Sequence, residues 1–186
     1  MRQLLGSMIL AFSLMEGVVV HAETFTVDEV KAVYLLNFTS YITWPEDEFS
    51  DPVAPFKYCL FKEGSPIREP MTEALRGESV GEHNIQFKII SLISAVKDCQ
   101  VLYIDKEQSA HAKNILQELA DTAVLTVSDQ PGFAKAGGGI ELYTQAGRVK
   151  LLINVKKVDE ARLTMSSKLL RVAELINDAD IGNEPW

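Results

Sequence analysis

The chain has 186 residues, 47% of them hydrophobic, and a formal net charge of −8 at pH 7. This length suits one domain of ordinary size with enough chain to bury a hydrophobic core. The acidic balance argues against nucleic acid or anionic lipid as the main partner, because both carry negative charge.

The N-terminus has the three parts of a secretory signal peptide. Arg2 supplies a positive charge, residues 4–14 are apolar, and Val20–His21–Ala22 is a small-x-small cleavage site. An uncleaved membrane anchor is the alternative, but Glu16 keeps the apolar run well short of the roughly 20 residues that a spanning helix needs. We therefore expect cleavage and an exported mature protein.

Export changes the expected chemical state of the two cysteines, Cys59 and Cys99. In an oxidising compartment they are candidates for a disulfide, and two cysteines allow only one intramolecular pairing. A bridge closing a loop of this length would stabilise the fold by about 4 kcal/mol in the chain-entropy description. The alternative from the residues alone is two separate buried thiols.

A capping-box pattern opens the first predicted helix, because Thr26 is followed three residues later by Glu29. The helix is predicted over residues 27–40 and ends before Pro45, which disfavours a helical conformation at the preceding residue. Residues 46–55 are typical of a surface loop. The predicted inner face consists of the apolar members of a set at helical spacing: Val30, Val33, Tyr34, Asn37 and Phe38.

Strands and helices alternate through the middle of the chain. Gly77 is expected to stop one helix and Ser109 to cap the next. Short apolar runs bounded by polar residues predict the strands, and apolar residues at helical spacing predict the helices. Strands are predicted over residues 56–61, 84–90, 99–104 and 123–127, and helices over residues 67–75 and 109–120.

This alternation indicates parallel strands joined by crossover helices. The pattern then changes, because residues 140–143 and 149–155 read as an antiparallel pair turned at 145–147, followed by a helix over 166–176 and a frayed polar tail over 177–186. The predicted fold class is therefore α/β, a single-domain three-layer Rossmann-like sandwich with a mixed, mostly parallel central sheet flanked by helices. Its expected boundaries are a signal peptide over residues 1–22 and one domain over 23–186.

The residue list favours no catalytic or cofactor chemistry. The mature chain keeps His83 and His111 without a short-spaced Cys/His cluster, so a metal site is not predicted. Ser94–Ala95–Val96–Lys97 matches Ser-x-x-Lys, but neither Ser-Asp-Asn nor Lys-Thr-Gly accompanies it. We therefore predict that the chain is not an enzyme and uses no cofactor.

The glycine run Gly137–Gly139 is no nucleotide-binding loop, because neither a Walker sequence nor Gly-x-Gly-x-x-Gly is present. We interpret it as structural, since glycine permits positive φ and close backbone approach. A backbone-lined ligand pocket is the alternative.

Polar and apolar residues near the C-terminus have structural interpretations as well as functional ones. Arg148 is expected to be a solvated or carboxylate-paired arginine, and Ser166 or Ser167 a helix N-cap. The apolar set Leu169, Leu170, Val172 and Ala173 is broad for one helix face, so part of it is expected to be partner surface.

Two segments of the chain resemble the YfiR-like family of small periplasmic proteins. The first carries Asn37, Phe38, Trp44 and Pro45. The second runs from the glycine cluster to the sequence SSKLLRVA and carries Gly138, Gly139, Gly147, Arg148, Asn154, Ser166, Ser167 and Lys168.

The resemblance implies a repressor that binds the periplasmic domain of an inner-membrane diguanylate cyclase and lowers cyclic-di-GMP and biofilm formation. It also implies that an outer-membrane lipoprotein with a peptidoglycan-binding domain can sequester the repressor. A homodimer is compatible with the resemblance. Cys59 and Cys99 match the positions of a family disulfide, while the second pair of some members is missing from this sequence. Within the C-terminal segment, partner contacts are expected at Leu169, Leu170 and Arg171.

The alternative function is a periplasmic sensor that binds a small molecule and has no cyclase partner. Its pocket would use the Gly137–Gly139 edge or the aromatic ring of Trp44 as a wall.

Overall fold

The structure, a computed structural model, describes residues 24–49, 51 and 53–176. The predicted signal peptide over residues 1–22 and the predicted tail over 177–186 lie outside these described residues. Within the described part of the chain, no helix combines the length and hydrophobicity needed to cross a membrane.

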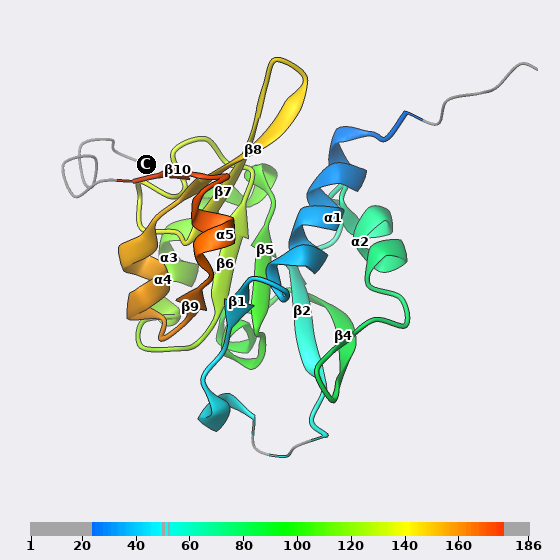
Figure 1. Cartoon of the computed structure of the whole chain (residues 1–186), viewed down its shortest axis with the longest axis vertical. Helices are drawn as coiled ribbons and strands as arrows, with labels where there is room; N and C mark the ends of the chain where they lie inside the picture. Colours follow the sequence, from blue (N-terminus) through cyan, green and yellow to red (C-terminus); the bar gives the residue numbers. More distant parts are fainter. Residues whose placement is uncertain (1–23, 50, 52, 177–186) are drawn as a thin grey trace, which may run out of the picture.

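An eight-stranded sheet forms the centre of the molecule (Figure 1). Its strands are β2 (Phe56–Phe61), β3 (Ser79–Val80), β4 (His83–Ile90), β5 (Val101–Ile104), β6 (Leu125–Ser128), β7 (Ile140–Gln145), β8 (Arg148–Ile153) and β10 (Glu174–Leu175). They lie in the order β10-β8-β7-β6-β5-β2-β4-β3. The β7–β8 and β3–β4 pairs are antiparallel and the other neighbours are parallel, which confirms the predicted mixed, mostly parallel sheet.

Helices cover both faces of this sheet. Alternate residues of a strand point to opposite faces, so Tyr58 and Leu60 enter one hydrophobic core while Cys59 and Phe61 enter the other. Figure 1 shows α1 and α5 in front of the sheet and the fainter α3 behind it, in agreement with the predicted three layers. The α-helices are α1 (Val27–Phe38), α2 (Arg68–Ala74), α3 (Ser109–Glu118), α4 (Val155–Glu160) and α5 (Ser167–Leu170), and the 3₁₀ helices are η1 (Glu46–Glu48), η2 (Ile93–Asp98) and η3 (Lys106–Gln108).

Helix α1 begins at the predicted capping box, in which Thr26 and Glu29 bond reciprocally. Its buried face differs from the predicted one, because Ala32, Leu35 and Phe38 are buried whereas the side chain of Val33 is 48% exposed. Apolar residues surround most of this helix, so their spacing does not single out one face. Tertiary contacts decide the orientation instead.

A buried ion pair takes part in that orientation. The ammonium group of Lys31 lies 2.9 Å from a carboxylate oxygen of Asp129 and 3.0 Å from one of Asp28. Burial lowers the pKa of Lys31, but the two carboxylates more than offset this effect, so the pKa is raised. Sequence reasoning missed this pair because Lys31 and Asp129 are far apart in the chain.

A second, two-stranded sheet was not predicted. It pairs β1 (Ile42–Thr43) with β9 (Thr164–Met165) in antiparallel fashion. The backbone N–H of Ser166 extends this contact by donating to the carbonyl of Tyr41 at 2.7 Å. The connection after α1 is thereby held against the connection before α5.

The predicted hairpin of β7 and β8 is confirmed, with Ala146 and Gly147 both at positive φ in its turn. The predicted end of the second strand at Val155 is wrong, because this residue begins α4. The side chain of Asn154 ends the strand and caps the helix by accepting from the N–H of Lys157 at 3.1 Å.

The predicted closing helix over residues 166–176 is also wrong. Helix α5 has four residues, and the chain then forms β10, which pairs with the edge of β8 through Glu174 and Leu175. The backbone groups of this segment find partners on the sheet edge, which outweighs the local helical pattern. Ser166 is the N-cap of α5, as one of the two predicted cap positions.

Smaller differences concern strand ends and caps. The strand predicted from Cys99 begins at Val101, and Ser109 is the first residue of α3 and not its cap. The cap position of α3 is Gln108, whose side chain makes no capping bond. Asp105 instead caps the preceding η3 by accepting from the N–H of Glu107 at 2.9 Å.

Candidate functional site

A hollow between α1 and α5 is the strongest candidate for a functional site. We call it the α1–α5 groove. It has a volume of about 370 Å³, within the range of small binding sites. Its lining residues come from α1 and the following connection, from β8 and from the α5 segment: Tyr34, Asn37, Phe38, Tyr41, Leu151, Lys168, Leu169 and Val172.

Several hydrogen bonds position the two walls of this groove. The β1–β9 pairing and the bond from Ser166 to Tyr41 hold the C-terminal end of α1 beside the start of α5. On the sheet side, the hydroxyl of Tyr58 donates to the carbonyl of Leu35 at 3.0 Å. The side chain of Ser166 accepts from the N–H of Lys168 at 3.2 Å and so orients the first turn of α5.

Apolar side chains are exposed to solvent in and beside the groove. Tyr41 is 38% exposed and Val172 is 73% exposed. Val33, next to the lining residue Tyr34 on α1, is 48% exposed but does not line the groove itself. Exposed apolar residues that gather beside a hollow are typical of protein contact sites.

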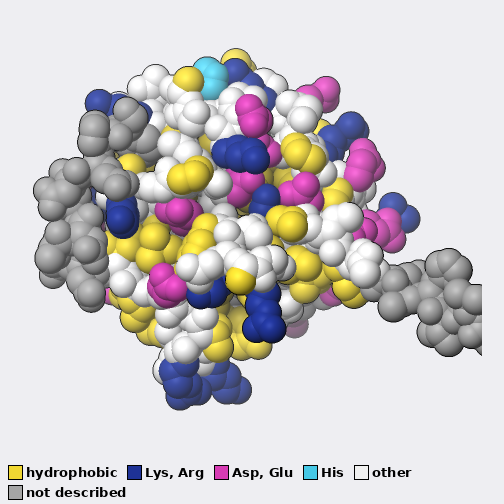
Figure 2. Space-filling view, turned by 90° about the horizontal axis from the view of Figure 1, so that it is seen from above, with side chains coloured by type: hydrophobic (Ala, Val, Ile, Leu, Met, Phe, Trp, Pro, Cys, Tyr) yellow, Lys and Arg dark blue, Asp and Glu magenta, His cyan; other side chains and the backbone are white. Residues whose placement is uncertain are grey.

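Positive charge accompanies this apolar surface, since Lys168 and Arg171 are exposed on the α5 segment. Figure 2, which looks down from above Figure 1, shows hydrophobic side chains exposed between charged ones, with Lys and Arg gathered at the lower edge. The lining of the groove contains one ammonium group, one amide and two tyrosine hydroxyls among apolar side chains. That set offers apolar surface and hydrogen-bonding groups of the kind found at protein contact sites.

The three predicted partner contacts differ in their placement. Leu169 is 4% exposed and belongs to the hydrophobic core, although one side of it lines the groove. Leu170 is half-buried and Arg171 is exposed. Their role in partner contact stays a prediction, and the structure adds Val172 and Tyr41, which line the same groove and are more accessible than Leu169.

The residues that carry the family resemblance divide into two groups. Asn37, Phe38 and Lys168 line the groove, although they lie in widely separated parts of the sequence. Ser166 and Ser167 begin the helix that forms one wall. The two resembling segments are therefore brought together at this site.

The glycines and Asn154 have structural roles. A Cβ atom on Gly138 would lie 2.1 Å from the ring of Phe133, and one on Gly139 would lie 3.0 Å from the carbonyl oxygen of Thr126. Gly147 has a φ of +75° in the hairpin turn, next to the exposed Arg148. The buried side chain of Asn154 donates to the carbonyl of Ala134 at 2.9 Å.

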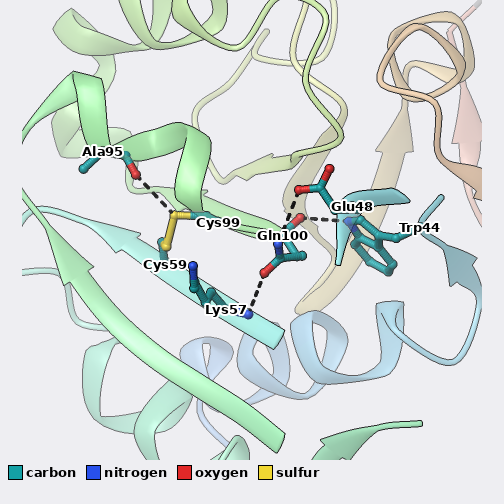
Figure 3. The surroundings of a disulfide bond; sticks show 7 residues. All are labelled: Trp44, Glu48, Lys57, Cys59, Ala95, Cys99 and Gln100. Atoms are coloured by element: carbon teal, nitrogen blue, oxygen red, sulfur yellow. Dashed lines mark hydrogen bonds between the residues drawn. A yellow bond between two sulfur atoms is a disulfide. The ribbon is translucent and has the colours of Figure 1, made fainter. Parts of the chain in front are cut away.

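Trp44 belongs to a buried network beside the disulfide (Figure 3). Its indole N–H donates to the carbonyl of Gln100 at 3.2 Å, and the ring packs edge-on against Phe56 with centroids 4.8 Å apart. The side chain of Gln100 accepts from the N–H of Lys57 at 2.8 Å and donates to Glu48 at 3.4 Å. Because Trp44 is 7% exposed and tied into this network, it forms no wall of the pockets described here.

The disulfide joins Cys59 on β2 to Cys99 before β5, with Cα atoms 5.9 Å apart, as the resemblance implied. Both residues are buried. The same network also includes Glu48, the last residue of η1. Pro45 occupies the N-terminal cap position of this 3₁₀ helix. Burial raises the pKa of the Glu48 carboxyl, although the hydrogen bond from Gln100 acts in the opposite direction.

The residues considered from the sequence for metal binding or catalysis, His83, His111 and Lys97, lie in different elements, β4, α3 and η2. In residues 24–49, 51 and 53–176, no three His, Cys, Asp or Glu side chains are arranged to hold a metal ion. The ammonium group of Lys97, from the Ser-x-x-Lys sequence, forms an ion pair with Glu118 at 2.7 Å. His83 lies against Phe49 and bonds to the carbonyl of Ala54 at 2.7 Å.

Comparisons with known proteins address both family and fold. A family described as YfiR/HmsC-like matches residues 28–174. The search of curated proteins gave no match. Among solved structures, the chain is similar to a crystal structure of an ABC domain in complex with L-Trp from Streptococcus pneumonia, with a TM-score of 0.54 and 10% identity. The match covers 78% of this chain and 60% of that one, and at this identity it shows the α/β fold alone.

Proposed function

Because the chain belongs to the YfiR/HmsC-like family, we propose that it is a periplasmic regulator that binds and represses an inner-membrane diguanylate cyclase. Residues 23–186 would be the mature domain, exported by the signal peptide at residues 1–22. Repression would lower cyclic-di-GMP and biofilm formation. Members of this family are regulators rather than enzymes, and we propose the same of this chain.

The α1–α5 groove is the observation that supports this proposal best. It joins both resembling segments at one surface, and its exposed apolar residues lie beside Lys168 and Arg171. Such a surface can bury an apolar partner segment and attract acidic side chains at its margin. We propose that the periplasmic domain of the cyclase contacts this groove.

Regulation would follow from competing binding equilibria. The chain represses if it binds the inactive state of the cyclase more tightly than the active state. An outer-membrane lipoprotein that binds peptidoglycan would release the cyclase by occupying the same repressor. No catalytic step by this chain is needed.

The test compares gene deletion with complementation in the native host. Deletion should raise cellular cyclic-di-GMP, and the wild-type gene should restore the original level. An unchanged level in the deletion strain under several growth conditions would contradict repression and favour a small-molecule sensor without a cyclase partner.

Two valines of equal exposure test the groove itself. Val172, at the groove, is 73% exposed, and Val53, in the loop before β2, is 72% exposed. Val172→Asp should abolish complementation, because a carboxylate there blocks apolar contact with the partner, whereas Val53→Asp should complement fully. Full complementation by both variants would show that the partner binds elsewhere.

A further inference from the structure

A second hollow lies between α3 and α4, and we call it the α3–α4 cleft. Its volume is about 700 Å³. One wall is a single face of α3 and its C-terminal end, with Lys113, Leu116, Gln117 and Ala120 at helical spacing. The other wall is formed by residues of α4 and the following residue, and the glycine-rich segment Lys135–Gly137 closes one end. No residue of the α1–α5 groove contributes to this lining.

The charges of the cleft are unevenly balanced. Lys157 and Glu160, both on α4, neutralise each other in an ion pair of 2.6 Å. Lys113 and Lys135 come from different elements and have no ion-pair partner in the part of the chain that the structure describes. With Asp121 as the remaining carboxylate of the lining, the cleft carries a net positive charge on a protein of net charge −8.

Apolar side chains accompany these ammonium groups. Leu119 is 7% exposed, Leu116, Ala136 and Ala161 are half-buried, and all four line the cleft. A ligand that contacts this surface needs an apolar body as well as a negative group. An inorganic anion alone would leave the apolar surface in contact with water.

Gly137 shapes the end of the cleft. Its φ of +105° is a conformation that L side chains rarely adopt. An ideal Cβ atom on it would lie 3.7 Å from Cε of Lys157, so the lysine stem rests across the bare backbone. Packing accounts for Gly138 and Gly139, whereas Gly137 contributes to the wall of a pocket.

We propose that the α3–α4 cleft binds a small organic anion that combines a carboxylate or phosphate group with an apolar body. The anionic group contacts Lys113 and Lys135, and the body lies on Leu116 and Ala161. This site is independent of the proposed cyclase partner, because it shares no residue with the α1–α5 groove.

The experiment measures binding to the mature protein purified from the periplasm, by calorimetry and by amide chemical shifts. Octanoate and octyl phosphate are the probes, and inorganic phosphate and 1-octanol are the controls that lack one of the two features. We expect saturable binding of one or both probes, with the controls at least about tenfold weaker, since each lacks one contact type. Comparing octanoate with octyl phosphate distinguishes a carboxylate ligand from a phosphate ligand.

A matched pair of variants locates the binding. K113Q/K135Q should weaken binding about tenfold, because the double variant removes both ammonium groups that the proposal places against the anionic group of the ligand. K156Q, on the exposed side of α4, should leave binding unchanged, and circular dichroism checks that each variant is folded. No saturable binding by the wild type, or equal binding by K113Q/K135Q and K156Q, would overturn the proposal.

Discussion

Two apolar regions of this protein differ in how much of their surface is exposed to water. Around the disulfide, Cys59, Cys99, Val96 and Ile115 are at most 1% exposed, so this region is a closed core. In and beside the α1–α5 groove, Tyr41 and Val172 keep a large part of their surface in water. Burial of the first region stabilises the fold, whereas the second leaves apolar surface exposed at the place where we propose that the partner binds.

The disulfide gives the largest expected effect on the closed side. Replacing both cysteines, Cys59→Ala with Cys99→Ala, should lower the free energy of unfolding by about 4 kcal/mol, because the unfolded chain gains the entropy of an open loop. Denaturant unfolding of the oxidised wild type and the double variant measures this difference. Equal midpoints and slopes would show that the bridge contributes no stability.

Helix α1 contains both kinds of surface within two residues. Leu35→Ala, on the buried face, should cost about 2–5 kcal/mol, because it leaves a cavity in the core. Val33→Ala, on the exposed face, should change stability by less than about 0.5 kcal/mol. If the two variants lose equal stability, the orientation of α1 described here is wrong.

Lys31, on the buried side of α1, makes a pH-dependent contribution to the free energy of unfolding. Because its folded-state pKa is raised above the ordinary value of 10.5, its contribution to stability is fully present below pH 10.5. It is lost as the pH rises through the folded-state pKa. The stability of the wild type relative to Lys31→Met should therefore decline above about pH 10.5 in denaturant titrations. A difference that stays constant to pH 11.5 would contradict a raised pKa.

The smallest effect on stability is expected at the open region. Val172→Asp and Val53→Asp should each change the unfolding free energy by less than about 0.5 kcal/mol, because both side chains are already largely in water. Thermal melts of the two variants measure this. A large loss in Val172→Asp alone would mean that the groove is part of the core.

Sequence patterns predicted the parallel part of the sheet well and the C-terminal part poorly. The strands over residues 56–61 and 84–90 are recognisable because each is an apolar or alternating run between polar residues. The end of the chain offers no such boundary, since residues 166–176 have apolar spacing compatible with a helix. Glu174 and Leu175 instead form a strand that pairs with the edge of β8. No pattern in the neighbouring residues predicts that pairing.

The candidate site was only partly predictable. Leu169 and Lys168 were identified through resemblance, and both line the groove. The exposure of Val33 was not foreseen, because an apolar residue at helical spacing is ordinarily assigned to the core. Where apolar residues surround a helix, spacing cannot tell core from contact surface.

The sequence by itself determined the family, the α/β class, the capping box at Thr26 and the hairpin turn at Gly147, because these depend on local conformation and on patterns of neighbouring residues. Tertiary structure alone decided which face of α1 is buried, how the C-terminal segment closes the sheet and where the two resembling segments meet. Those outcomes depend on pairings between residues far apart in the chain, such as Lys31 with Asp129 and Tyr41 with Ser166. Their free energy appears only when the partners are brought together, so no stretch of sequence contains it.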